Sequence, residues 1–112
     1  MPGKTHTVKL KATNRSLVHL YRVFNRAYFG NKLDNGVAVR FGKSTQSPWM
    51  GCYVEEFETI YINPALRRFK RVTCMVLLHE MAHVATPGKG HGHKFQRMMH
   101  ALADCGAFEN LW

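Results

Sequence analysis

The sequence predicts an α+β fold in which helices pack on one side of a small sheet. Apolar residues recur at spacings of three and four along residues 15–29, and two later segments, 69–85 and 92–104, are apolar and long enough for helices. Three shorter segments between the first and second helices have the pattern of strands. Because the connections between these strands are short, we expect three strands in a mainly antiparallel or mixed sheet.

The first helix is predicted over residues 15–29 and ends at Gly30, a residue type that commonly terminates helices. Its core-facing stripe consists of Leu17, Leu20, Tyr21, Phe24 and Tyr28. After the turn-forming residues 34–36, residues 37–41 alternate as a half-buried strand does. A second strand is expected over residues 49–54, where Gly51 indicates a bulge or a close backbone approach. Residues 59–62 form the third strand.

Helical structure returns after the third strand. Asn63 and Pro64 are typical of an N-cap followed by the first helical residue. The main helix is predicted over residues 69–85 and stops at Pro87. A final helix over residues 92–104 closes the fold, and its inward residues are Phe95, Met98, Met99 and Leu102.

The length of 112 residues predicts a single domain over residues 1–112, with residues 1–14 as a basic extension or edge segment. The longest apolar run, residues 74–78, is far shorter than the roughly 20 residues of a membrane span. The start of the chain lacks the apolar stretch of a signal peptide. The cysteines are odd in number, widely spaced and without a CxxC pair, which is typical of reduced thiols. We therefore expect a cytoplasmic monomer without membrane contact.

Basic residues dominate the charge: 16 Lys and Arg oppose 7 Asp and Glu, a net charge of +9. Residues 1–33 contain no acidic residue, and residues 67–97 contain Glu80 alone. Such a surface attracts polyanions, so we expect non-specific contact with DNA.

The main helix contains the sequence HExxH at residues 79–83. Residues four apart lie above one another on a helix, so His79 and His83 can bind one zinc ion. Glu80 would lie beside the metal, where it can accept a proton from water. The motif follows a strongly apolar stretch, and two histidines and a carboxylate are costly to bury unless a partner such as a metal compensates them.

A catalytic zinc site needs a third protein ligand and an open fourth position. After the Pro/Gly-rich turn at residues 87–90, the chain presents His91 and His93, and either could reach the metal. A downstream glutamate ligand is poorly supported, since Glu109 is the only candidate.

Three stretches resemble the SprT-like (Spartan-type) zinc metalloproteases: residues 20–33 (LYRVFNRAYFGNKL), residues 77–84 (LLHEMAHV) and residues 91–99 (HGHKFQRMM). The resemblance covers about residues 17–104. It implies a zincin-like minimal metalloprotease domain with one catalytic Zn²⁺, and it assigns His91, the histidine of HGxxF, as the third ligand. His93 then occupies a variable position, and Cys52 is interpreted as a packed thiol. The family also has members that act on proteins crosslinked to DNA, whereas the zinc ribbon that many members carry has no counterpart here.

The leading hypothesis is a zinc-dependent endopeptidase that cleaves proteins, among them proteins bound or crosslinked to DNA. Glu80 is the predicted catalytic base, and His79, His83 and His91 are the predicted zinc ligands. Four residues are candidate donors to the oxyanion: Tyr53, Tyr61, His93 and His100. We expect the substrate to lie extended along a strand edge between residues 49 and 62. The alternative is a zinc-stabilised nucleic-acid-binding module with little or no catalysis, which a closed coordination sphere completed by His93 or a cysteine would favour.

Overall fold

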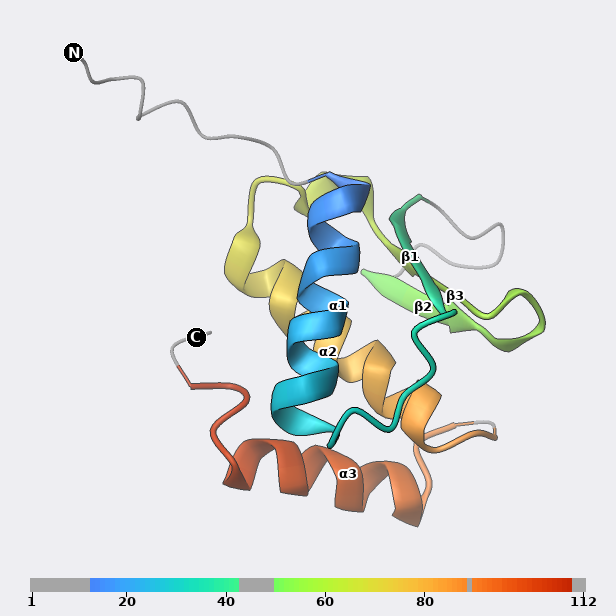
Figure 1. The fold of residues 1–112 in the computed structure, drawn as a ribbon, viewed down its shortest axis with the longest axis vertical. Coiled ribbons are helices and arrows are strands. Elements are labelled where there is room, and N and C mark those ends of the chain that lie inside the picture. Colours follow the sequence, from blue (N-terminus) through green and yellow to red (C-terminus); the bar gives the residue numbers. More distant parts are fainter. Residues whose placement is uncertain (1–12, 43–49, 89, 110–112) are drawn as a thin grey trace.

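The structure is a computed structural model that describes residues 13–42, 50–88 and 90–109. Its elements follow in the order α1, three strands, α2 and α3, with a short 3₁₀ turn on either side of the last strand (Figure 1). The predicted α+β class is therefore confirmed.

Helix α1 covers Asn14–Tyr28, close to the predicted segment. Thr13 caps it: the Thr13 side chain accepts a hydrogen bond from the Ser16 N–H, and the Ser16 hydroxyl accepts one from the Thr13 N–H. The helix stops at Phe29, and Gly30 follows with a φ of 61°. Of the predicted apolar stripe, Leu17 and Tyr21 are fully buried and the other members are partly buried against the core.

The three strands are β1 (Ala38–Phe41), β2 (Gly51–Val54) and β3 (Thr59–Ile62). Their order in the sheet is β1-β3-β2, in which β1 pairs with β3 in parallel and β2 pairs with β3 antiparallel. The sheet is thus mixed, as expected. Trp49, predicted as the start of the second strand, and residues 1–12 of the predicted basic extension lie outside the described residues.

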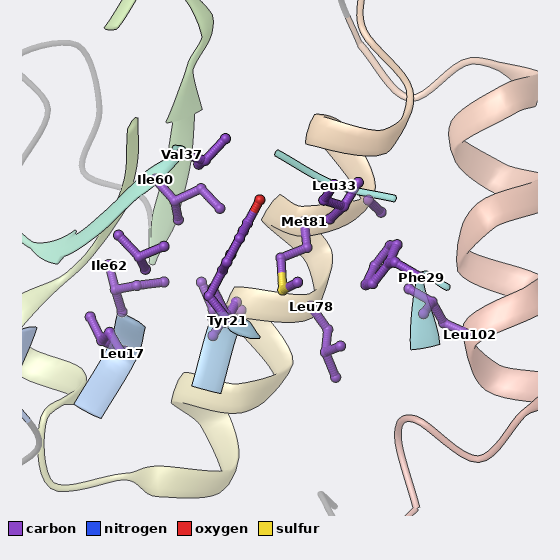
Figure 2. Packing of buried hydrophobic residues seen from close by; sticks show 14 of the residues in the cluster. Leu17, Tyr21, Phe29, Leu33, Val37, Ile60, Ile62, Leu78, Met81 and Leu102 are labelled. Carbon is purple, nitrogen blue, oxygen red and sulfur yellow. The ribbon is translucent and has the colours of Figure 1, made fainter. Parts of the chain in front are cut away.

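Helix α2 covers Lys70–Ala85 and packs against β2 and β3, whereas α1 packs against β1. Figure 2 shows Tyr21 of α1 between Ile60 of the sheet and Met81 of α2. These side chains are almost inaccessible to solvent, so the centre of the core holds α2 rigidly in place. No helix in the described ranges is long and apolar enough to cross a membrane.

Helix α3 covers His93–Asp104, packs against α2 and runs crosswise to α1 in Figure 1. Phe95 and Leu102 are buried as predicted, while Met98 and Met99 are half-buried at the margin of the core. The chain therefore returns to the C-terminal half of α2 and places residues 91–95 beside the HExxH motif.

Candidate metal centre

Helix α2 presents the HExxH motif from its C-terminal half. Glu80 is buried with 6% of its surface exposed, and His79 and His83 are half-buried on the same side of the helix. Leu77, Leu78, Met81 and Ala82 are fully buried, so one flank of the motif lies in the core while His79 and His83 line the cleft described below. Their packing fixes the direction in which both imidazoles point.

A glycine-containing turn brings the third histidine to the first two. Gly88 and Gly90 have φ angles of 124° and 82°, which side-chain-bearing residues rarely adopt. The chain can therefore reverse direction directly after α2 and place His91 against the helix that it has just left. His91 itself is exposed.

The three histidines form a cluster in which one nitrogen of each lies within 4.8 Å of the others. Nitrogens bound to one tetrahedral zinc ion, at about 2.0–2.1 Å from it, are roughly 3.3 Å apart. Small side-chain rotations would close that difference. The donor set of three imidazoles therefore fits a zinc ion that keeps a fourth position for another ligand.

Phe95 forms the wall behind this cluster. Its ring stacks on His83 with a centroid distance of 4.3 Å and lies 5.0 Å from His79 and 4.7 Å from His91. Because Phe95 contacts all three imidazoles, it restricts their rotation and excludes water from one side of the site. The HGxxF spacing is the sequence signal for this residue.

The surroundings of His79 and His83 favour their neutral forms. Burial, together with the neighbouring His79 and His91, lowers the pKa of His83 to about 4. Burial and His91 also lower the pKa of His79. Metal ions bind the neutral form of histidine, so protons compete weakly with a metal at these two residues.

Glu80 is held by the neighbouring strand. Burial raises the pKa of its carboxyl group to about 7, and a hydrogen bond from the backbone N–H of Tyr53 acts in the opposite direction. The contact depends on how closely β2 approaches α2. A Cβ atom on Gly51 would lie 2.6 Å from Val76 Cγ1 and 3.0 Å from the Tyr61 carbonyl oxygen. The predicted close backbone approach at Gly51 is thus confirmed, and its effect is to bring Tyr53 to Glu80.

The cluster opens into a cleft of about 1200 Å³ between β2 and α2. His79, Glu80, His83 and His91 all line it. Apolar side chains form the wall toward the start of α2, namely Met50, Val72, Met75 and Val76. Glu55 and Glu56, which follow β2, line the opposite end. The lining of the cleft is therefore apolar beside the start of α2 and acidic beside the end of β2.

The four candidate oxyanion donors do not lie together. Tyr53 lines the cleft, whereas Tyr61 lies on the central strand β3. His93 and His100 are exposed on α3, and His93 is not part of the histidine cluster found among the described residues. Burial raises the pKa of the Tyr53 hydroxyl, and the negative charges of Glu55, Glu58 and Asp34 act in the same direction. The oxyanion donor stays a prediction.

Asn25 is a structural residue that the sequence patterns did not reveal. It is fully buried in α1, donates a hydrogen bond to the Leu33 carbonyl and accepts one from the Leu33 N–H. Asn14 similarly accepts a hydrogen bond from the Phe41 N–H. Both side chains connect α1 to β1 or to the segment before it, and neither lines the cleft.

Comparison with solved structures finds the fold in a crystal structure of the metallopeptidase zymogen of Pyrococcus abyssi abylysin. The two chains share 18% sequence identity with a TM-score of 0.62, over 85% of this chain and 87% of the other. At this identity the likeness establishes the fold alone. Among curated proteins, none matches the sequence.

Comparison with protein families gives a match to the SprT-like family over residues 17–110. The matched region begins within α1 and includes the HExxH helix, the glycine-containing turn and α3. It therefore covers every residue of the histidine cluster and most of the chain, and the chain belongs to the SprT-like family.

Proposed function

We propose that this protein is a zinc-dependent endopeptidase in which His79, His83 and His91 hold one zinc ion and Glu80 is the general base. The observation that carries the proposal is the convergence of three imidazoles beside a buried carboxylate in an open cleft. A fully coordinated structural zinc would need a fourth protein ligand, and the cluster found among the described residues contains three. Catalysis is therefore favoured over a purely structural metal.

A bound zinc ion would polarise the peptide carbonyl and make water more acidic. Glu80 would accept a proton from the attacking water and deliver it to the departing amine. The Tyr53 N–H fixes the carboxylate for both transfers. A pKa near 7 in the metal-free protein shows that the surroundings of Glu80 disfavour its negative charge, which makes it a stronger base than an ordinary carboxylate.

The strand β2 supplies a surface for the substrate. In the described sheet, β2 pairs with β3 on one side only, and all of Gly51–Val54 line the cleft. An extended peptide could hydrogen-bond to this edge through its backbone. Because hydrogen bonds between backbones do not depend on the identity of the side chains, we propose that the protease has a loose preference for the substrate's sequence.

The test compares the native protein with Glu80→Gln. We expect the variant to bind one zinc ion, measured by elemental analysis, and to cleave unfolded casein at least a hundredfold more slowly. Glu109→Gln makes the same chemical change at an exposed position outside the cleft and should cleave at the native rate. Equal cleavage by the native and Glu80→Gln proteins would refute the assignment.

We further propose that proteins bound or crosslinked to DNA are among the substrates. The support is the net charge of +9 and the basic segments on both sides of the HExxH motif in the sequence. Single-stranded DNA should accelerate cleavage of a DNA-binding protein, and the acceleration should decline as salt increases. A protease indifferent to both DNA and salt would contradict this part of the proposal.

A further inference from the structure

The five residues Arg67–Arg71, at the entrance to α2, form an exposed basic-aromatic segment with the sequence RRFKR. Phe69 is 58% exposed, and Met50 and Phe57 are the other exposed large apolar side chains of the described residues. A single exposed phenylalanine is ordinary on a protein surface. Its position between two pairs of cations is what distinguishes it.

The charges of the segment are unbalanced in the free protein. No acidic residue occurs in the sequence between Glu58 and Glu80, and the first turn of α2 contains none. Cations at a helix N-terminus oppose the helix dipole, and the cap residue Phe69 offers no side-chain hydrogen bond to the first turn. An anion placed here would therefore interact favourably with both the side chains and the helix end.

Arg67 fixes one end of the segment. Its guanidinium lies over the Phe41 ring at 5.0 Å from the ring centre. The segment is thereby attached to β1, and Arg68, Lys70 and Arg71 remain exposed around Phe69. The result is one aromatic ring with three cations on a segment that contacts β1 through Arg67 and continues into α2.

We propose that Arg67–Arg71 binds single-stranded polynucleotide, with phosphates on Arg68, Lys70 and Arg71 and one base stacked on Phe69. Cations that follow a phosphate backbone and an aromatic ring that stacks with a base are the two components of single-strand recognition. A duplex offers the same phosphates but hides the faces of its bases. A membrane-binding helix would need a broad apolar face, and the immediate neighbours of Phe69 are cations.

The position of the segment gives this binding a use, which rests on the proposed protease function. Val72, the next residue along the chain, already lines the cleft. Lys70 precedes His79 by nine residues of continuous helix, which corresponds to roughly 14 Å along the helix axis. A protein attached to a strand bound at Arg67–Arg71 would therefore be held beside the apolar end of the cleft.

Binding is tested directly by fluorescence anisotropy with a labelled oligothymidine and a labelled duplex of equal length. We expect Phe69→Ala to weaken oligothymidine binding by roughly fivefold to a hundredfold, with a much smaller effect on the duplex, and Phe69→Tyr to bind like the native protein. Arg68→Ser/Arg71→Ser should reduce the slope of log K against log salt by about 1.4, or about 0.7 per lost phosphate contact.

The matched control is Arg22→Ser/Arg26→Ser, which removes two exposed charges from α1. Equal weakening by both pairs of arginine substitutions would overturn the proposal, because binding would then follow net charge alone. Native-like oligothymidine binding by Phe69→Ala would also overturn it, as would tighter binding to phosphatidylserine vesicles that depends on Phe69. Casein cleavage is measured separately, so a failure of the protease assignment is distinguished from a failure of the polynucleotide site.

Discussion

The candidate metal centre joins two regions that hold their histidines in different ways. His79 and His83 project from α2, a helix with one flank in the core, and both are half-buried. His91 is exposed and follows a turn whose conformation depends on Gly88 and Gly90. The helix therefore fixes two ligand positions through packing, whereas the turn positions the third mainly through backbone conformation.

The same contrast extends to energetics. On α2, burial shifts the pKa values of His79, Glu80 and His83 against their charged forms. Burying these polar groups costs free energy, which the packing of α2 in the core offsets. The turn contributes little packing to the fold. We infer that changes on the α2 side alter both stability and metal binding, while changes in the turn alter metal binding alone.

The largest effect is expected from removing the ligands. His79→Ala and His91→Ala should each reduce zinc affinity by more than about 100-fold. This loss exceeds the one that follows when a residue that hydrogen-bonds to a metal ligand is removed. In the metal-free protein, only His79→Ala should lower the melting temperature, because His79 is half-buried on α2 whereas His91 is exposed. Competition with a chromophoric chelator and calorimetry in EDTA measure the two quantities. Native zinc affinity in His91→Ala, with loss in His93→Ala, would reassign the third ligand.

The second effect is the pH dependence of stability in the metal-free protein. The pKa of Glu80 is raised from 4.5 to about 7 in the folded state, so the folded protein binds the proton more tightly than the unfolded chain. The resulting destabilisation is absent below pH 4.5, grows as the pH rises, and is complete above pH 7. Glu80→Gln should therefore be more stable than the native protein at pH 8 by about 3 kcal/mol.

Urea unfolding in EDTA at pH 4.5 and pH 8 measures this difference. At the lower pH the two proteins should have nearly equal free energies of unfolding, since Glu80 is then protonated in the folded protein. A stability difference that is the same at both pH values would show that the carboxylate is not disfavoured by burial.

The third effect concerns the contact between β2 and α2. Gly51→Ala would place a Cβ against Val76, displace β2 and weaken the Tyr53 hydrogen bond to Glu80. We expect kcat for casein to fall by roughly tenfold to a hundredfold, because displacing a catalytic group by about 1 Å slows enzymes by up to about a hundredfold. Zinc affinity should stay native, because no ligand lies on β2.

A second substitution tests the cause. Val76→Ala removes the side-chain atom nearest to the new methyl group and should partly restore kcat in Gly51→Ala/Val76→Ala. Val76→Ala alone should retain kcat. An unchanged kcat in Gly51→Ala would mean that Glu80 does not depend on the position of β2.

Local patterns predicted most of the fold because each element has its own signal. The helix spacing of residues 15–29, the turn at residues 34–36 and the alternation in residues 59–62 each gave bounds within about one residue of the observed element. The parallel pairing of β1 with β3 has no local signal, since it depends on how separate segments meet. The exposure of Phe69 also has no local signal, because an aromatic residue at the start of a helix can be either buried or exposed.

The site was predictable to the extent that its chemistry lies within one helix. The HExxH spacing brings His79 and His83 together without any tertiary information. The position of His91 beside the other two histidines depends on positive φ angles at Gly88 and Gly90, which the sequence does not specify. The assignment of His91 rather than His93 as the third ligand came from the resemblance to the family. The Tyr53 contact with Glu80 involves a backbone group, which no residue type marks in a sequence.

The smallest effect is expected in the turn itself, from Gly90→Ala. Gly90 has a φ of 82°, and nothing lies within 4 Å of the position that a methyl group would take, so the substitution creates backbone strain without a clash. In the metal-free protein the exposed turn can relax, whereas zinc binding through His91 requires the strained conformation. The strain, about 1 kcal/mol, should therefore appear as a roughly fivefold loss of zinc affinity with an unchanged melting temperature in EDTA. A lower melting temperature without loss of affinity would place the turn, like α2, among the elements that stabilise the fold.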